Sequence, residues 1–600
     1  MYRVFVSILA GTVAALAVGG VAAAAPPGGA DLVYRNGFVY TVDAHNRIRQ
    51  AVAIRAGRIV YAGTDRGVQR FVGLATRSVD LHGRMLMPGL IDGHMHPFEA
   101  GRMLLKCDLH YAALTVPEMQ ALIKSCLEAS RDQEPDRWLE VVSWFQEAMR
   151  PEGVVTTKAV LDSLATSRPI LVRSSFGHSG LANSRALALV GINAGTPEPL
   201  GGKIWRDESG APTGRLEDAA NAVVWKAIPE PTPAEDETAV RAALAAMNRQ
   251  GVTSFLEAIA PPAALAAFRA IERAGGLTAR AHFAPMIEPE TGKNPARAVA
   301  EMTALAQRYD EGPLKPDPSL TVRNAKLFMD GVITAPALTG VMLAPYYVNA
   351  GTAEHARWEP GASSGPEVYF PAPLLAEILT RLAKAGIDPH LHADGDGAVR
   401  AALDAIAAMR AAVRRSDIRP AIAHDEIVDP GDFGRFRQLR ALPVLSFQWG
   451  KPAPDTVDGD APYLGPARAK LLEPAGLLAA NGARVCFGSD WPVDALDEWF
   501  ALKVGVTRTN APSAGPKYAG RLGEDPGLSR RQVLRAATIN SAYELHQERV
   551  TGSIEVGKFA DLIVLDRNPL TVPAEEIANI KVLQTLVGGR EVYAAPGFGP

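Results

Sequence analysis

Cysteine is scarce in this chain of 600 residues, which contains only Cys107, Cys126 and Cys486. This composition excludes a small scaffold that depends on several disulfides, and it suits a large domain held together by its hydrophobic core. Cys107 and Cys126 are compatible with a disulfide in an oxidising compartment. The sequence leaves both states open, because it does not fix the distance between them. We expect Cys486 to be an inert core residue of a buried strand.

An excess of charge of one sign is also missing. Lysine and arginine number 62 against 65 aspartates and glutamates, a formal net charge of −3, and the chain has no long basic run. Nucleic acid is therefore not an expected partner. The length exceeds that of one ordinary domain, so we expect a large core of enzyme size with an accessory domain or insertion.

Charge is almost absent from the first 25 residues, where Arg3 precedes an apolar run over residues 4–21. Four alanines at 22–25 then meet two prolines, which predicts a signal peptide over residues 1–25. The protein would be exported, periplasmic or secreted, without stable membrane insertion after cleavage. An uncleaved membrane anchor is the alternative, because the run is near the minimum spanning length. No arginine pair precedes the run and no cysteine directly follows it, which argues against twin-arginine export and a lipoprotein anchor.

Short β runs with turns occupy both ends of the mature chain. They cover residues 31–81 and 560–593, with turn signals such as Asn36-Gly37. Two β-rich ends around a long middle predict one small composite β-sandwich domain, built from residues 30–82 and 548–597.

The middle of the chain alternates apolar strands with helical stretches, which is typical of an α/β protein with a (β/α)8 barrel of TIM type. We predict this barrel over residues 83–547. The first strand candidate is the run that leads to His94, and the other seven are residues 252–257, 279–285, 323–328, 388–392, 421–424, 443–448 and 484–489.

One connection of the predicted barrel is unusually long. Residues 97–238 exceed a single loop and predict a large insertion after barrel strand 1, a lid or substrate-binding subdomain over the barrel mouth. A helix that starts after Thr115, with Glu118 three residues later, is expected within it.

The strongest chemical signal is His94-Met95-His96, which follows the apolar run of residues 85–93. Residues i and i+2 of a strand point to the same side, so these two imidazoles can bind one metal ion. A lone His-x-His pair also arises by chance. Its meaning therefore depends on what the other strand ends carry.

Polar side chains lie at or near the ends of several other predicted strands, where the active sites of such barrels lie. They are Lys326, His392, His424 and Asp490. Imidazoles suit zinc-like ions. A bound metal lowers the pKa of a water to about 7, and Asp490 can both ligate the metal and take a proton. Lysine itself is a poor ligand, so we expect a carbamate, formed on Lys326 with CO₂, that bridges two metals.

The sequence leaves the number of metals open. With an unmodified Lys326, a mononuclear site of His94, His96, His392 and Asp490 remains. His390 shares the face of His392 but lies deeper in the strand, so we expect it to support the ligands.

Motifs along nearly the whole mature chain resemble the amidohydrolase superfamily, and most closely amidohydrolase family 3, the N-substituted formamide deformylase-like group. They are residues 88–96, 326–331, 488–493 and 552–562. Residues 392–396 resemble the family's His-Ala-Ile-Gly-Asp, with Asp394 in place of the Ile. Ala423 stands before His424 where the family has Glu. This resemblance implies a metal-dependent hydrolase.

Two segments of the insertion also resemble this family. Residues 212–217 resemble its Pro-Thr-Gly-x-Leu motif, and Gly177-His178-Ser179 resembles its Asp-Gly-His-Ser segment, with Phe176 in place of the Asp. The resemblance makes His178 a candidate substrate-binding residue. The departures at Phe176 and Ala423 affect the family's substrate contacts rather than its metal ligands.

Residues and resemblance together predict an exported hydrolase that cleaves an amide-type C–N bond, N-acyl or N-formyl, of a small molecule. One or two divalent metals, most readily zinc, would serve as cofactor, with Asp490 as general base and acid. A hydrolase of esters, lactones or phosphoesters on the same site is one alternative, since fold and metal do not fix the bond. A non-catalytic exported binding or regulatory protein is another. A homo-oligomer is compatible with the sequence.

Overall fold

The computed structural model describes residues 29–134, 136–151, 153–175, 179–199, 202–335, 337–352, 355–414 and 417–598. The predicted signal peptide over residues 1–25 and the candidate substrate residue His178 lie outside these ranges. Within them, every helix is too short or too polar to cross a membrane.

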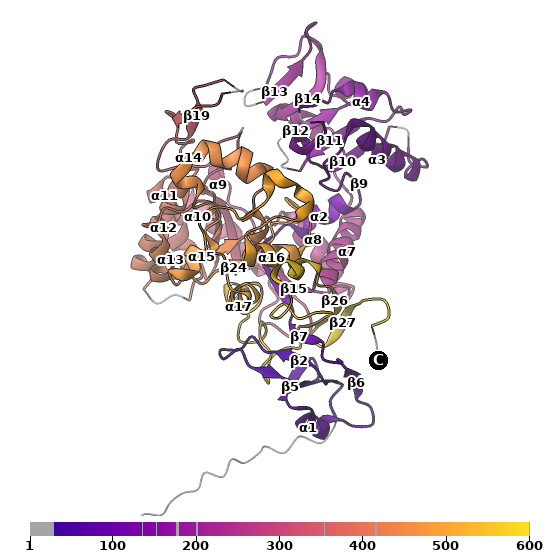
Figure 1. The fold of residues 1–600 in the computed structure, drawn as a ribbon, viewed down its shortest axis with the longest axis vertical. Coiled ribbons are helices and arrows are strands. Elements are labelled where there is room, and N and C mark those ends of the chain that lie inside the picture. The colour runs from indigo at the N-terminus through magenta and orange to yellow at the C-terminus, as the bar shows by residue number, and fades with distance from the viewer. Residues whose placement is uncertain are drawn as a thin grey trace, which may run out of the picture.

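Two parallel sheets form the centre of the molecule (Figure 1). Their strands are buried almost throughout, so they read as continuous apolar runs. The first sheet contains β8 (Leu90–Met95), β15 (Val252–Glu257), β16 (Arg280–Phe283) and β17 (Leu320–Thr321), and the second contains β18 (Asn324–Phe328), β21 (Asp388–Ala393), β22 (Ala421–His424), β23 (Leu442–Leu445) and β24 (Cys486–Phe487).

Backbone contacts join the two sheets at both of their edges. Met286 and Lys326 form a parallel bridge on one side. On the other, Asp490 N–H donates to His94 O at 2.7 Å, and His96 N–H donates to Trp491 O at 2.7 Å. The result is an α/β fold of TIM-barrel type in which the carboxyl ends of β8 and β24 meet.

Helices follow most of these strands and surround them in Figure 1. One of them is α11 (Ala372–Ala385), bounded by Gly386 in the left-handed conformation that favours glycine. The others in this layer include α2 (Pro97–Leu104), α7 (Pro233–Gln250), α8 (Pro262–Arg273), α10 (Pro295–Tyr309), α12 (Asp396–Ala412), α13 (Phe433–Leu439), α15 (Ala475–Ala480) and α16 (Glu498–Thr507).

The apolar run before His94 is two strands, not the single strand expected. β7 (Met85–Pro88) pairs with β2 (Phe38–Tyr40) and β25 (Leu562–Leu565) in a different sheet, and only β8 belongs to the central sheets. Gly89 separates them. A Cβ there would lie 2.2 Å from Thr253 Cγ2, so the chain passes only without a side chain. Both strands are buried, and apolar content therefore cannot reveal the break.

Both ends of the described chain meet in a six-stranded sheet. Its order is β27 (Arg590–Ala594), β26 (Val582–Val587), β25, β7, β2 and β3 (Ile48–Arg49). A four-stranded sheet of β5 (Arg58–Gly63), β4 (Ala51–Arg55), β1 (Leu32–Arg35) and β6 (Arg77–Asp80) packs against it. Tyr34, Ile54, Leu86 and Val564 share the apolar core between them.

A buried ion pair ties this terminal part to the central sheets. Arg280 of β16 donates to both carboxylate oxygens of Asp561, at 2.7 and 3.0 Å, and both side chains are fully buried. Arg280 also donates to the backbone oxygen of Pro316 at 2.8 Å.

Another six-stranded sheet stands at the opposite end of the molecule (Figure 1). It has the order β13 (Gly202–Arg206), β14 (Pro212–Asp218), β12 (Ser179–Ala182), β11 (Ile170–Ser174), β10 (Leu139–Trp144) and β9 (Cys107–Asp108). Helix α2 lies within the expected insertion of residues 97–238 and α7 begins within it, and these two helices pack on each other beside the central sheets.

The insertion's first long helix is α3 (Val116–Ala129), which starts at a capping box of Thr115 and Glu118. Cys107 and Cys126 form a disulfide between β9 and α3, with the two Cα atoms 5.7 Å apart. Cys486 is free and buried in β24.

Candidate metal centre

The first group of candidate ligands consists of His94, His96 and Asp490. His94 Nε2 and His96 Nε2 lie 3.3 and 2.9 Å from Asp490 Oδ1. With bonds of about 2.0–2.1 Å, the ligand atoms of a tetrahedral zinc ion lie roughly 3.3 Å apart. The spacing therefore fits one metal ion. The positive φ of Asp490, 56°, and its backbone bond to His94 turn the carboxylate toward the two imidazoles.

A second group lies at the ends of β21 and β22 and consists of His392, Asp394 and His424. In each group the ligand atoms lie within 4.8 Å of one another. His392 Nε2 is 3.4 Å from Asp394 Oδ1. His424 Nδ1 is 4.0 Å from Asp490 Oδ2, and the rings of His94 and His424 are 4.8 Å apart. The two groups are therefore adjacent and form one candidate dinuclear centre.

Lys326 lies beside the first group of candidate ligands, close to His94. Its Nζ is 3.4 Å from His94 Nε2 and 4.7 Å from the centre of the Phe328 ring, and the side chain is buried. Burial lowers the pKa of Lys326 to about 8, although Asp490 and Asp394 act in the opposite direction. Burial thus favours the neutral amine, which is the form that reacts with CO₂.

His390 lies behind His94 rather than beside the second group. Its Nε2 is 2.7 Å from His94 Nδ1, and its own Nδ1 is 3.6 Å from Glu544 Oε1. All three side chains are buried. A hydrogen bond to the second nitrogen of a metal-binding imidazole fixes its tautomer and orientation. Glu544, in α18 (Ser541–Glu544), carries no sequence motif, and only the fold brings it here.

Protonation within the centre follows burial and neighbours. Burial lowers the pKa of His392 to about 3 and keeps this imidazole neutral, the form that binds metals. Burial raises the pKa of Asp490, but its hydrogen bond to His96 and the nearby cationic groups outweigh this and hold the pKa below the usual value. For His96 burial is again opposed, since Asp490 and Glu257 raise its pKa to about 9. Asp490 is therefore an ionised carboxylate.

All six metal ligands expected from the sequence converge: His94, His96, Lys326, His392, His424 and Asp490. His178 lies outside the described residues. Asp394 was not expected as a ligand. Its signal was its position two residues after His392, the same spacing that joins His94 to His96.

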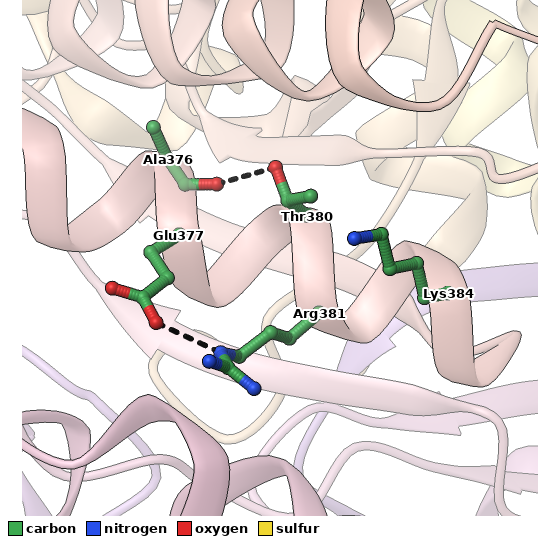
Figure 2. A pocket seen from close by; sticks show the side chains of 5 residues that line it. All are labelled: Ala376, Glu377, Thr380, Arg381 and Lys384. Atoms are coloured by element: carbon green, nitrogen blue, oxygen red, sulfur yellow. Dashed lines mark hydrogen bonds and ion pairs between the residues drawn. The ribbon is translucent and has the colours of Figure 1, made fainter.

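Two cavities among the described residues are lined by side chains other than the candidate ligands. One of about 370 Å³ is a surface hollow on α11 (Figure 2), where the dashed bonds join Thr380 to Ala376 and Arg381 to Glu377. These are ordinary bonds one helical turn apart, and no catalytic group lines the hollow. The other, of about 290 Å³, lies between α2 and the insertion and includes Tyr111, Ser143 and Trp491. Tyr111 donates to Pro492 O at 2.7 Å, which links the insertion to the loop after Asp490.

Comparisons with known proteins agree with this geometry. The amidohydrolase family model matches residues 77–593. An N-substituted formamide deformylase from Arthrobacter pascens is 28% identical over 585 residues, covering 94% of this chain and 99% of that protein. The exoenzymes regulatory protein AepA from Pectobacterium carotovorum is 28% identical, covering 68% and 83%. The solved structure of an uncharacterized metal-dependent hydrolase from Pyrococcus horikoshii has a TM-score of 0.69 at 23% identity, covering 90% and 99%.

Proposed function

The chain belongs to the amidohydrolase family and is a hydrolase of carbon–nitrogen bonds, and from that premise we propose that it cleaves an amide-type bond, N-acyl or N-formyl, in a small molecule. The observation that carries the proposal is the convergence of two ligand groups, each with two imidazoles and one carboxylate, on adjacent strand ends. The formamide deformylase among its relatives supports this class of bond.

In this proposal His94, His96 and Asp490 hold one divalent metal, and His392 and His424 hold a second. Zinc suits imidazole and carboxylate ligands at these spacings. A bound metal of this kind polarises a carbonyl and makes a water more acidic. Lys326, as a carbamate, would add an anionic bridge between the two positions.

The proton steps fall to Asp490. It is ionised and buried, and its Oδ1 has no hydrogen-bond donor among the described residues besides the imidazoles of the centre. Asp490 would accept a proton from the attacking water and deliver it to the leaving nitrogen. His390 and Glu544 would hold His94 in the tautomer that leaves Nε2 free for the metal.

We further propose that the protein is exported and works outside the cytoplasm. The support is the signal-like segment of residues 1–25 and the disulfide between Cys107 and Cys126, since disulfides persist in oxidising compartments. The proposal also treats the termini as one β-sandwich domain and the sheet β9 to β14 as the substrate-binding lid.

The test combines metal analysis with hydrolysis of a panel of N-formyl and N-acyl amines, esters, lactones and phosphoesters. We expect at least one divalent metal per chain and turnover of amides. Asp490→Asn should lower kcat by about 10²–10⁴-fold, the usual contribution of general acid–base catalysis. Asp425→Asn, a buried carboxylate next to His424, is the control. Preference for esters or phosphoesters would move the assignment to another bond, and a metal-free protein without turnover would favour a regulatory role.

A further inference from the structure

Asp394 occupies the position of the isoleucine in the family motif that residues 392–396 resemble. The hydrogen bonds around it do not account for a carboxylate at this position. The side chain is 1% exposed. Its Oδ1 has no hydrogen-bond donor among the described residues apart from the imidazole of His392 at 3.4 Å. A buried carboxylate oxygen without a partner is costly, so such a group calls for a specific reason.

Asp330, the neighbouring buried carboxylate, shows what a structural role looks like here. Its oxygens accept backbone N–H bonds from Asp394, Gly395 and Val341, at 3.1, 3.0 and 2.8 Å. These bonds tie the turn after β21 in place. Asp394 contributes only its backbone to this arrangement, since its N–H bonds Asp330 and its carbonyl accepts from Ile427 at 3.2 Å. The turn therefore holds the Asp394 side chain without using it.

The direction of that side chain follows from strand geometry. His392 is the last but one residue of β21, and Asp394, two residues later, directly follows the strand, so both side chains can point to the same side. The side chain of Asp394 thereby joins His392 and His424, and the ligand atoms of the three lie within 4.8 Å of one another. The 3.4 Å between His392 Nε2 and Asp394 Oδ1 is close to the roughly 3.3 Å between two ligands of a tetrahedral zinc ion.

Aromatic rings fix the two imidazoles of this group. The His392 ring lies 4.5 Å from the Phe328 ring, and the His424 ring stacks on Trp449 at 5.5 Å. His392 Nε2 also lies 3.0 Å from Gly331 O, and a metal bound through Nε2 would replace that contact.

Charge around the group is unbalanced. The buried carboxylates Asp330, Asp490 and Glu473 repel a negative charge on Asp394, and Lys326 is the cation that opposes them. A divalent cation between the imidazoles and Asp394 would offset this excess of carboxylates.

We propose that Asp394 is a direct ligand of the second metal, which His392, Asp394 and His424 hold as a three-ligand site. The inference rests on the proposed function, because it assumes a metal centre at these strand ends. It deepens that function, since the second position then takes its anionic ligand from the chain itself. A carbamate on Lys326 is not required for two metals to bind.

The experiment uses the full mature chain, stripped of metal with a chelator and reloaded with Zn²⁺ in buffer freed of CO₂ or in buffer with bicarbonate. The number of Zn²⁺ ions per chain is measured by elemental mass spectrometry. The affinity for Zn²⁺ is measured by competition with a chromophoric chelator. Asp394→Asn and Asp394→Ile remove the proposed ligand in two ways, so that one remains if the other fails to fold. Asp425→Asn removes a different buried carboxylate beside His424.

We expect wild-type protein to bind two Zn²⁺ with or without bicarbonate, and both Asp394 variants to keep only the first. Loss of a residue that hydrogen-bonds to a metal ligand lowers metal affinity by about 10–100-fold. Loss of a ligand itself should therefore lower the Zn²⁺ affinity of the second site by more than about 100-fold. Asp425→Asn should retain two metals.

Four results would overturn the inference. One is a second Zn²⁺ that binds the wild type only with bicarbonate. Another is an Asp394→Asn variant that binds like Asp425→Asn. A wild type that holds one Zn²⁺ under all conditions also refutes the three-ligand site, while the proposed function stands. A wild type that binds none refutes both.

Discussion

The buried ion pair between Arg280 and Asp561 gives the sharpest test of how the chain ends are tied to the central sheets. Both side chains are fully buried, and two N–H···O bonds of 2.7 and 3.0 Å join them. Asp561 also accepts from Gly588 N–H at 2.7 Å. Asp561→Asn keeps the volume and removes the charge, so the guanidinium of Arg280 stays buried without a counter-ion.

Removal of one partner of a buried pair costs about 3–5 kcal/mol, because the remaining charge cannot be hydrated. Unfolding entropy is about 2.1 cal/mol/K per residue, which for 600 residues that unfold together is about 1.3 kcal/mol/K. The expected fall in Tm is therefore about 2–4 °C. If the terminal sheets unfold as a separate unit, their unfolding entropy is smaller because fewer residues take part. The same loss of free energy then lowers the Tm of that transition by more.

Thermal unfolding followed by circular dichroism and calorimetry measures this shift. Glu377→Gln is the matched control, since it removes one carboxylate from an exposed pair with Arg381, visible in Figure 2. Such a pair contributes about 0.3–0.5 kcal/mol, a Tm change well below 1 °C. The double change Arg280→Met with Asp561→Leu should recover part of the loss. Equal Tm values for Asp561→Asn and Glu377→Gln would refute the reasoning.

Three further predictions concern metal, pH and the disulfide. Dialysis against a chelator should abolish hydrolysis and lower Tm, and Zn²⁺ should restore both, since a ligand that binds only the folded state stabilises it; activity that survives complete metal removal contradicts this. Burial lowers the pKa of His282 to about 3, so between pH 6.5 and 4.5 the unfolded chain takes up a proton that the folded chain does not. Stability is therefore lost as pH falls, by about 2–3 kcal/mol from this group, and His282→Gln should show a smaller acid-induced fall in Tm than the wild type. Cys126→Ser opens a loop of 19 residues and should cost about 3 kcal/mol within the insertion; hydrogen exchange should rise in β9 and α3, and a rise of similar size in β21 would contradict a local effect.

Much of the centre follows from sequence because strand periodicity is a local property. His94 and His96 share a face through alternation alone. Lys326, His392, His424 and Asp490 each lie within, at the end of or just after a segment that reads as a strand. What brings them together is the parallel order of those strands, which a TIM-barrel-type fold supplies.

The features that sequence did not reveal depend on distant parts of the chain. The break at Gly89 is set by Thr253, and the role of β7 is set by its partner β25 near the other end. Glu544 reaches His390 from a short helix without a motif. Asp394 was visible as a departure from a family motif and by its spacing to His392, but its unpartnered oxygen becomes evident only once its neighbours are placed.

The sheet that contains β7 combines strands from both ends of the chain, which affects the order in which it can form during translation. β7 lies between β2, which leaves the ribosome early, and β25, which emerges near the end. Its last residue, Pro88, is only six positions before His94. The strand that leads to the first candidate metal ligand therefore lacks one of its neighbours until translation is almost complete, so the metal centre can form only late in folding.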